Sequence, residues 1–252
     1  MASKPLNVVI VGGHGKVSLR LTHLLTARPN TKVTSIIRSP DHIPSITELS
    51  ATPLLLSLED APVSDFAAAF KAASADVVYF SAGAGGQGGP ERTRKVDEEG
   101  AIKVFDALES LAEGERPRLI LVSAIDTRDP EKPPPAYYTE EDLNVSARVR
   151  SRIAAYMAAK YAADKNLAAR TAFKWTMLRP GGLTDGPGTG TGVVGHAHLS
   201  KTISRDDVAK VLFLLLERDD AAGLGIDLVG GDEPLENALD AFIAKGESDF
   251  LG

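Results

Sequence analysis

The sequence has no cysteine among its 252 residues, which excludes disulfide bonds, thiol nucleophiles and cysteine-ligated metals. It has no basic excess either, because 28 lysines and arginines face 34 acidic residues and leave a net charge of -6. A nucleic-acid-binding surface is therefore not expected. The longest apolar run, at residues 211–216, is too short to cross a bilayer, and no signal-peptide pattern precedes the first apolar stretch. These absences predict a cytoplasmic protein with neither a membrane nor nucleic acid as a partner.

What the sequence does contain is a regular alternation of strand-like and helix-like segments. Strands are expected at residues 8–11, 32–38, 52–58, 76–83, 118–123, 174–178 and 226–229. Helices are expected to begin near residues 17 and 204 and to occupy residues 61–73, 91–113, 148–169 and 235–245. Such alternation requires a parallel sheet covered by helices on both faces. We therefore expect one α/β domain over residues 1–252.

A glycine cluster directly follows the first apolar stretch and opens the first expected helix. A turn of this kind gathers backbone N–H groups at a helix N-terminus, where the helix dipole also favours an anion. Gly12 permits the strained turn, and Gly15 lets a pyrophosphate approach the backbone closely. The spacing Gly12-x-x-Gly15-x-x-Ser18 departs from the full dinucleotide motif, so an ordinary glycine-rich turn is the alternative. Its place after the first strand favours a Rossmann-type doubly wound parallel β-sheet.

The ends of the second and third expected strands point to the cofactor. In a dinucleotide fold an acidic residue at the end of the second strand binds the 2′-hydroxyl of NAD, but this sequence has Arg38 there. A cation suits the 2′-phosphate of NADP, so NADP(H) is preferred and NAD(H) is the alternative. The other interpretation of Arg38 is a solvent-exposed arginine with no role in cofactor binding. Asp60 is a candidate for the adenine amine or, equally, for the cap of the helix at residues 61–73.

Tyr156 and Lys160 are four residues apart on an expected helix and therefore share one face. A nearby ammonium stabilises a phenolate and lowers the phenol's pKa, so Tyr156 is a candidate acid/base for a hydride-transfer reaction. Lys160 is also placed to bind the nicotinamide ribose. Two surface residues on an alanine-rich helix are the alternative. The pair follows both the glycine turn and Ser123, which ends the fifth expected strand. This order along the chain favours the catalytic interpretation.

Two irregular stretches are expected to shape a substrate pocket. The stretch at residues 130–142 has four prolines and interrupts the α/β pattern without ending it, so it reads as an active-site loop. A glycine-rich loop is expected at residues 186–195. We expect the substrate loops near residues 124–145 and 182–203. His196 and His198 follow the second loop, but no third ligand stands near them, so no metal site is expected.

The sequence resembles the atypical short-chain dehydrogenase/reductases of the NAD(P)-binding, NmrA-like branch. The resemblance rests on the segments VVIVGGHGKVS, SIIRS, LED, VVYFSAGAGG, VDEEGAIK, LILVSAID, YMAAKYAAD, WTMLRPGGLT, ISRDDVA and GGDEPLENAL. It implies that Gly12, Gly15 and Lys16 hold the pyrophosphate, and that Pro180 and Gly181 flank the nicotinamide. The full set of implied cofactor residues is Gly12, Gly13, His14, Gly15, Lys16, Val17, Arg38, Ser39, Leu58, Glu59, Asp60, Ser81, Ala82, Gly83, Val122, Ser123, Tyr156, Lys160, Pro180, Gly181, Gly182 and Leu183.

The resemblance implies a catalytic set of Tyr156, Lys160 and Ser123, with one departure. Members with a working triad often carry serine where this chain has Ala124, and Thr127 is a candidate substitute. We expect an NADP(H)-dependent oxidoreductase that transfers hydride to or from a small carbonyl or alcohol substrate, as a monomer or homodimer. The alternatives are a non-catalytic NADPH-sensing regulator and a sugar-nucleotide-type epimerase or dehydratase.

Overall fold

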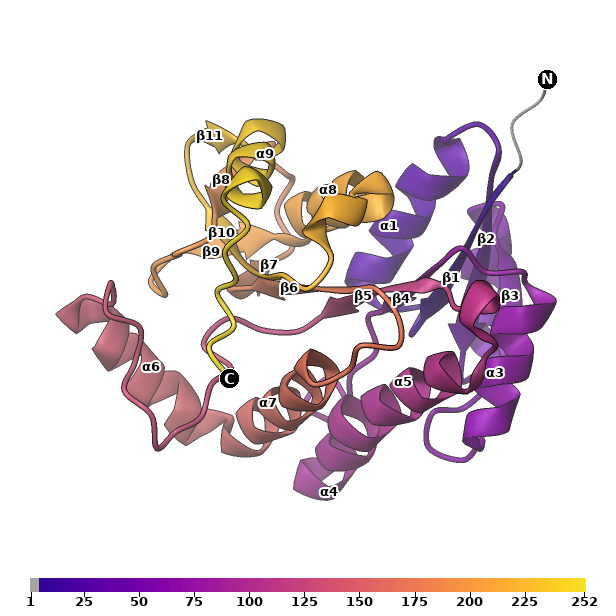
Figure 1. Ribbon diagram of the computed structural model, residues 1–252, viewed down its shortest axis with the longest axis horizontal. Helices are drawn as coiled ribbons and strands as arrows, with labels where there is room; N and C mark the ends of the chain where they lie inside the picture. Colours follow the sequence, from indigo (N-terminus) through magenta and orange to yellow (C-terminus); the bar gives the residue numbers. More distant parts are fainter. Residues whose placement is uncertain (1–4) are drawn as a thin grey trace.

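A twisted sheet runs through the middle of the molecule (Figure 1). The computed structural model describes residues 5–252, and within them nine strands pair in the order β11-β8-β10-β6-β5-β4-β1-β2-β3. The strands from β3 to β10 in this order are all parallel to their neighbours, which gives the Rossmann order around β1. Their bounds are β3 (Thr52–Leu55), β2 (Thr31–Ile37), β1 (Leu6–Val11), β4 (Val77–Phe80), β5 (Arg118–Val122), β6 (Trp175–Pro180) and β10 (Gly225–Gly230).

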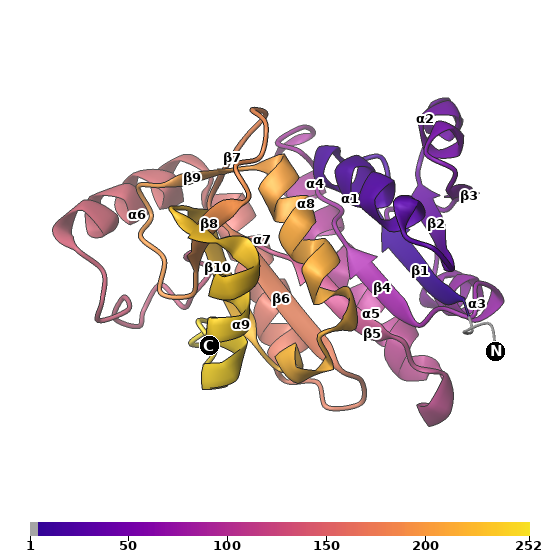
Figure 2. The same ribbon diagram turned by 90° about the horizontal axis from the view of Figure 1, so that it is seen from above.

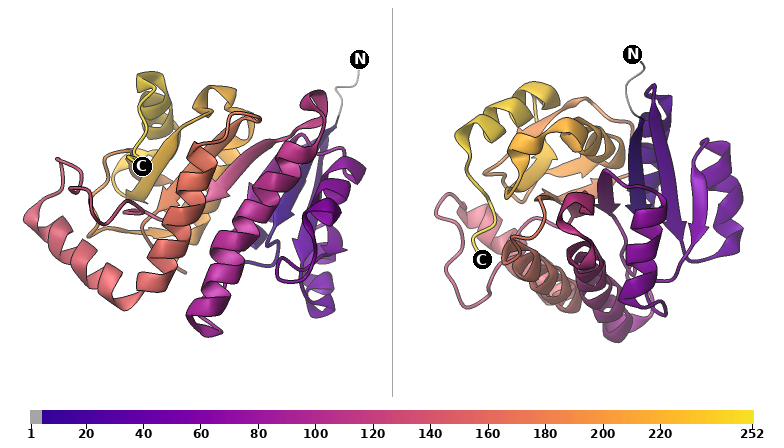
Figure 3. Two further views of the ribbon diagram at one scale, coloured as in Figure 1. Left: turned by 60° about the horizontal axis from the view of Figure 1, so that its bottom comes forward. Right: turned by 45° about the vertical axis from the view of Figure 1, so that its right-hand side comes forward.

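Helices cover both faces of this sheet. One face carries α1 (Lys16–Ala27), α8 (Arg205–Leu214) and α9 (Leu235–Lys245), and Figure 2 shows α1 and α8 lying side by side. The other face carries α3 (Val63–Ala72), α5 (Gly100–Ser110) and α7 (Ala154–Ala168), and α5 and α7 lie next to each other in Figure 3. The prediction of a single-domain, doubly wound α/β fold is confirmed.

The first strand shows why this arrangement follows from the sequence. Its side chains alternate between the two faces, so Val8 and Ile10 join the core under α1 while Val9 and Val11 join the core under α3 and α5. All four are almost completely buried. A strand buried on both faces needs a continuous apolar run, which is the pattern that residues 8–11 present.

The sheet has an antiparallel edge that the sequence did not reveal. Residues 186–195 were expected to form a loop, but β8 (Thr191–Val194) pairs antiparallel with β10, and β11 (Glu233–Pro234) pairs with β8. Gly192 fits there because a Cβ would lie 2.7 Å from the side chain of Leu235 and 2.8 Å from the Val229 carbonyl. A separate two-stranded sheet is formed by β7 (Gly182–Thr184) and β9 (Thr202–Ser204).

Two expected helices are interrupted. The one predicted for residues 91–113 divides into α4 (Gly89–Thr93), a π-helical turn (Arg94–Glu99) and α5. The π turn admits an extra residue and brings both Val96 and Asp97 into the interior.

The helix predicted for residues 148–169 is also two helices. α6 (Glu140–Arg152) starts inside the stretch expected to be irregular, and Ile153, at φ −127° and ψ 39°, separates it from α7. A reciprocal capping box starts α6, in which the Thr139 hydroxyl accepts from the Asp142 N–H and the Asp142 carboxylate accepts from the Thr139 N–H. The prolines before residue 136 masked this start in the sequence.

The remaining elements are short. They are α2 (Ile43–Glu48) and the 3₁₀ turns at Pro40–His42, Glu113–Glu115, Leu215–Glu217 and Asp219–Ala221. Among residues 5–252, no helix is both long enough and apolar enough to cross a membrane.

Candidate active site and cofactor groove

Three adjoining hollows open at the carboxyl ends of the parallel strands. The Arg38 hollow, about 300 Å³, lies between the ends of β1, β2 and β3 and is lined by Arg38, His42, Glu59 and Arg92 among others. The Lys160 groove, about 490 Å³, shares Gly15, Ser81, Ala82 and Gly83 with that hollow. The Val149 cavity, about 380 Å³, shares Ser123, Ile153, Tyr156, Pro180 and Leu183 with the Lys160 groove. A continuous path therefore runs from Arg38 past Tyr156 into a side cavity.

The glycine turn between β1 and α1 forms the floor of this path. Gly12 has a φ of +84°, and a Cβ there would lie 2.6 Å from the Ala82 Cα. A Cβ on Gly13 would lie 2.5 Å from the Ser35 side chain, so the turn packs directly against β2 and the end of β4. Gly15 precedes α1 and no side chain caps that helix, which leaves its first amides without a side-chain acceptor. This bare helix N-terminus fits a pyrophosphate.

Two cationic side chains, those of Lys16 and Arg205, line the Lys160 groove next to the glycine turn, and both form ion pairs with the same carboxylate. Lys16 Nζ lies 2.7 Å from Asp185 Oδ2, and Arg205 Nη1 lies 2.9 Å from Asp185 Oδ1. Lys16, Val17 and Arg205 all line the Lys160 groove. The predicted pyrophosphate ligand Lys16 is thus tied to the segment between β7 and β8. Arg205 is a second basic group that the sequence did not single out.

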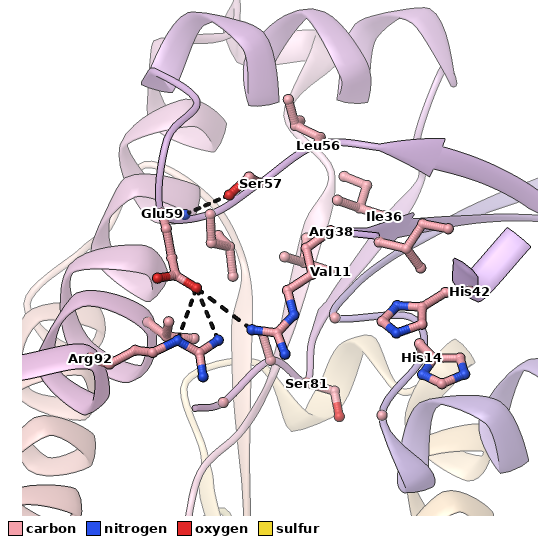
Figure 4. Close-up of a pocket in the computed structure, with 17 residues that line it drawn as sticks. Val11, His14, Ile36, Arg38, His42, Leu56, Ser57, Glu59, Ser81 and Arg92 are labelled. Atoms are coloured by element: carbon pink, nitrogen blue, oxygen red, sulfur yellow. Dashed lines mark hydrogen bonds and ion pairs between the residues drawn. The ribbon is translucent and has the colours of Figure 1, made fainter. Parts of the chain in front are cut away.

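The Arg38 hollow brings two guanidinium groups onto one carboxylate (Figure 4). Arg92 donates to Glu59 Oε1 through Nε at 3.1 Å and Nη2 at 2.9 Å, and Arg38 Nη1 lies 3.6 Å from the same oxygen. Arg38 is the more exposed of the two, at 56% against 20% for Arg92. Arg92 belongs to α4, far from Arg38 in the sequence, and no motif around it signals a phosphate contact.

The same hollow contains two imidazoles that lie face to face. The ring centres of His14 and His42 are 3.7 Å apart, and the two rings are stacked nearly parallel, with 5° between their planes (Figure 4). Burial, and then the neighbouring His42, lower the pKa of His14, which favours the neutral ring. His14 was predicted to line the cofactor site and does line this hollow, whereas His42 was missed.

Other predicted residues at this end separate into two groups. Leu58, Glu59, Ser81, Ala82 and Gly83 line the Arg38 hollow. Gly13, Ser39 and Asp60 are not among its lining residues. Ser39 instead caps the turn at Pro40–His42, and Asp60 accepts a hydrogen bond from the Ser57 hydroxyl at 2.7 Å. The alternative that Asp60 caps the next helix is wrong, because α3 starts after Pro62.

Tyr156 and Lys160 meet in the Lys160 groove, as their spacing on α7 predicted. The Lys160 Nζ lies 5.8 Å from the centre of the Tyr156 ring. It donates to the Val122 carbonyl at 3.2 Å and lies 3.5 Å from Asp97 Oδ1. Lys160 and Asp97 are 4% and 1% exposed, so this ion pair is closed off from solvent. Asp97, which the π turn carries inward, also accepts from the Ala84 N–H at 2.9 Å.

The electrostatic balance at Tyr156 differs from the expectation. Burial raises the pKa of Tyr156, and the opposing effect of Lys160 is too small to reverse it. Lys160 thus lowers the pKa of Tyr156 as predicted, but burial, which the sequence did not reveal, raises that pKa by more. Burial would lower the pKa of Lys160, but Tyr156 and Asp97 outweigh it and raise that pKa, so the ammonium stays charged.

Ser123 lines both the groove and the cavity, but its hydroxyl has another partner. Ser123 Oγ and Thr127 Oγ1 each donate to Asp164 Oδ2 at 2.6 Å. Asp164 lies on α7, one turn beyond Lys160, and is fully buried. While this pair of bonds persists, the Ser123 proton cannot also be given to a substrate, so the catalytic role of Ser123 stays a prediction.

Pro180 and Gly181, predicted to flank the nicotinamide, lie near Tyr156 together with the predicted cofactor residues Val122, Gly182 and Leu183. Val122, Pro180 and Leu183 line the Lys160 groove, and Gly181 and Gly182 line the Val149 cavity. Gly181 is tightly placed, because a Cβ there would lie 2.9 Å from the Val229 side chain.

The two histidines after the glycine-rich stretch are structural. His198 Nδ1 lies 2.7 Å from Asp142 Oδ2 at the start of α6, and the His196 ring stacks on Tyr137 with ring centres 4.6 Å apart. Within residues 5–252, no group of three or more His, Asp or Glu side chains is placed to hold a metal.

Comparison with known proteins agrees with this geometry. A family model described as NAD(P)H-binding matches residues 12–219. A UPF0659 protein of Schizosaccharomyces pombe is 40% identical over 96% of this chain and 97% of its own length. YhfK of Bacillus subtilis, named as an uncharacterized sugar epimerase, is 32% identical over 93% of this chain and 99% of its own length.

Solved structures share the fold. A Bacillus halodurans protein named as an NAD-dependent epimerase/dehydratase superposes with a TM-score of 0.76 and 29% identity, over 94% of this chain and 99% of that one. A Veillonella parvula short-chain dehydrogenase/reductase solved with NADP superposes at a TM-score of 0.66 and 16% identity, over 91% and 96%. Because the family model covers most of the chain and the relatives align end to end, this chain belongs to the NAD(P)H-binding family.

Proposed function

We propose that this chain is an NADP(H)-dependent oxidoreductase that reduces a small carbonyl compound, or oxidises the matching alcohol, with Tyr156 as the acid/base. The observation that carries the proposal is the position of Tyr156. It lies where a groove that fits a dinucleotide meets a separate cavity, with the Lys160 ammonium on the same helix face.

The residues divide the chemistry between them. A bound nicotinamide supplies or accepts the hydride. Tyr156 donates its hydroxyl proton to the substrate oxygen as the carbonyl is reduced, and it takes that proton back in the reverse direction. The Lys160 ammonium stabilises the phenolate left behind, and its own position is fixed by Val122 and Asp97. A raised pKa keeps Tyr156 protonated and ready to act as an acid at neutral pH.

The test of this role is Tyr156→Phe, which removes one oxygen atom. We expect turnover of a carbonyl substrate, followed as loss of NADPH absorbance, to fall by about 10²–10⁴-fold. NADPH affinity should stay unchanged. Tyr161→Phe is the matched control, because Tyr161 lies on the same helix and its hydroxyl has no hydrogen-bond partner within residues 5–252. Wild-type turnover in Tyr156→Phe would reject the assignment.

The preference for NADP(H) rests on Arg38 and Arg92 together. Both guanidinium groups face the hollow beyond the glycine turn, where a 2′-phosphate can replace Glu59 as their anionic partner. We expect Arg38→Ala and Arg92→Ala each to weaken NADPH binding about tenfold, as measured by titration, and to leave NADH binding nearly unchanged. Arg94→Ala is the control, since Arg94 is exposed and pairs with Glu99. Equal affinity of the wild type for both cofactors would contradict the preference.

A non-catalytic NADPH sensor is the second candidate, favoured by the bond between Ser123 and Asp164. That bond, together with Ala124 at the next position, leaves Tyr156 without a serine partner. A sensor would bind NADPH tightly and turn over no member of a broad carbonyl and alcohol panel. The epimerase or dehydratase alternative, which matches the names of two relatives, predicts conversion of a sugar nucleotide without net consumption of NADPH.

A further inference from the structure

The walls of the Val149 cavity are mostly apolar. The cavity lies beside Tyr156 between α6, the start of α7 and the segment that joins β6 to β9. Its apolar lining residues are Ala124, Ile125, Val145, Val149, Ile153, Met157, Pro180, Leu183 and Leu199. Ile153 and Leu183 also line the Lys160 groove and are 44% and 37% exposed. A cavity of this lining favours an apolar molecular body.

Three polar side chains in these walls, Ser123, Asp126 and Ser146, already have partners. Ser123 donates to Asp164. The Asp126 carboxylate accepts from Ser146 at 2.6 Å, from Arg128 at 2.9 Å and from Arg150 at 3.2 Å. Because two arginines surround it, Asp126 does not present a net negative charge to the cavity. These groups define the wall and have little capacity left for a ligand.

Besides the hydroxyls of Tyr156 and Thr202, the polar side-chain group left in these walls is the ammonium of Lys201. Lys201 lines the cavity just before β9, and within residues 5–252 its ammonium makes no ion pair and no hydrogen bond. Its backbone is held in place, because Thr202 pairs with Gly182 and the Lys201 carbonyl packs against Gly181. The cavity therefore combines an apolar interior, a phenol and one unpaired cation.

We propose that the substrate is an apolar carbonyl compound that also carries a carboxylate, and that Lys201 binds this carboxylate. The proposal rests on the oxidoreductase function above, since it places the carbonyl at Tyr156 and the carboxylate at Lys201. A single lysine is a point charge without a fork of donors, so it suits a monoanion better than a phosphate ester, for which arginine's bidentate fork is favoured. Lys201 is a specificity-determining residue in this scheme and takes no part in proton transfer.

The experiment compares an acid with its neutral ester. The probes are para-formylbenzoate and its methyl ester, together with the biphenyl homologues of both, which extend the distance between the aldehyde and the charge. Binding to the NADP⁺-saturated protein is measured by calorimetry, so the result does not depend on turnover. Reduction of the same probes with NADPH is measured in parallel. The variants are Lys201→Met, Tyr156→Phe and Lys32→Met. Lys32→Met is the control, because Lys32 is an exposed lysine of β2 that does not line the cavity.

We expect the wild type to bind at least one acid about tenfold more tightly than its ester, as befits a charge-assisted contact. Lys201→Met should abolish this preference and leave ester binding unchanged. Tyr156→Phe and Lys32→Met should keep it. Equal binding of acid and ester, retention of the preference in Lys201→Met, or no binding of either acid overturns the proposal. Loss of turnover alone, with the acid preference intact, counts against the oxidoreductase function and not against Lys201.

Discussion

Lys160 lies between Tyr156 and Asp97, and these two groups have opposite effects on how far its charge can stabilise a phenolate. Tyr156 gains from the lysine's positive charge when it becomes a phenolate, whereas Asp97 neutralises part of that charge from the other side. Three effects act on the pKa of Tyr156: burial, the largest, raises it, Lys160 lowers it, and Asp97 raises it. Asp97 is therefore a positioning residue that holds the ammonium and tunes the phenol through it.

This balance predicts a pH effect in Asp97→Asn. Removing the carboxylate leaves the Lys160 charge uncompensated, which lowers the pKa of Tyr156. In the proposed function, carbonyl reduction needs the protonated phenol, so activity is expected to fall as the pH rises through that pKa. The fall should move to lower pH in Asp97→Asn, as read from the pH profile of kcat. Asp65→Asn, an exposed change on α3, should leave the profile in place, and an unmoved profile in Asp97→Asn would refute the coupling.

At the scale of elements, the start of α6 is held by one carboxylate with many partners. Asp142 accepts from the Thr139 N–H and hydroxyl, each at 2.8 Å, from the Leu199 N–H at 2.7 Å, and it contacts His198. It thereby joins the capping box of α6 to the segment before β9. Both of these segments contribute lining residues to the Val149 cavity.

We expect Asp142→Ala to lower the free energy of unfolding by about 1–2 kcal/mol, because it removes a helix cap and leaves the partly buried N–H groups of Thr139 and Leu199 without their acceptor. Urea unfolding at neutral pH measures the change. Glu141→Ala is the control, since Glu141 is the exposed neighbour on the same turn. A loss no larger than that of the control would show that α6 does not depend on this cap.

The same carboxylate gives the fold a sensitivity to acid. Burial by itself would raise the pKa of Asp142, but hydrogen bonds from Thr139, His198 and Leu199 outweigh it and lower the pKa to about 2 from 3.8. A lowered folded-state pKa means that the stabilisation is complete above the ordinary value. It is lost as the pH falls from 3.8 towards 2. Stability measured over this range should fall less steeply in Asp142→Ala than in the wild type.

At the scale of the whole molecule, Asp185 links the starts of two neighbouring helices, α1 and α8, through ion pairs with Lys16 and Arg205. Lys16 belongs to the first turn of α1, whereas Arg205 begins α8 and Asp185 follows β7. A pyrophosphate bound at the glycine turn competes with Asp185 for both cations. We expect Asp185→Asn to tighten NADPH binding a few-fold at low salt, with the gain disappearing at high salt. Asp232→Asn tests for a general charge effect, and weaker NADPH binding in Asp185→Asn would mean that the Asp185 carboxylate positions Lys16 and Arg205 for binding instead of competing for them.

The sequence predicted the architecture because the parallel strands leave a strong local signal. Strands such as residues 8–11 are apolar on both faces, and the glycine turn marks the first crossover. Arg92 and Asp97 could not be found in this way. Each acts on a residue distant in the sequence, and Asp97 reaches Lys160 only through a π turn that periodicity does not reveal. The start of α6 could have been found, since Thr139 and Asp142 have capping-box spacing.

The break at Ile153 has a consequence for how such a protein evolves. It turns α6 away as a separate helix whose main neighbour is α7, and its inward residues Val145 and Val149 line the Val149 cavity but not the Lys160 groove. If the Val149 cavity holds the substrate, as proposed, substitutions on this helix change the cavity without changing any residue that lines the Lys160 groove. A lineage can then vary this part of the substrate pocket while the proposed nucleotide site is inherited intact.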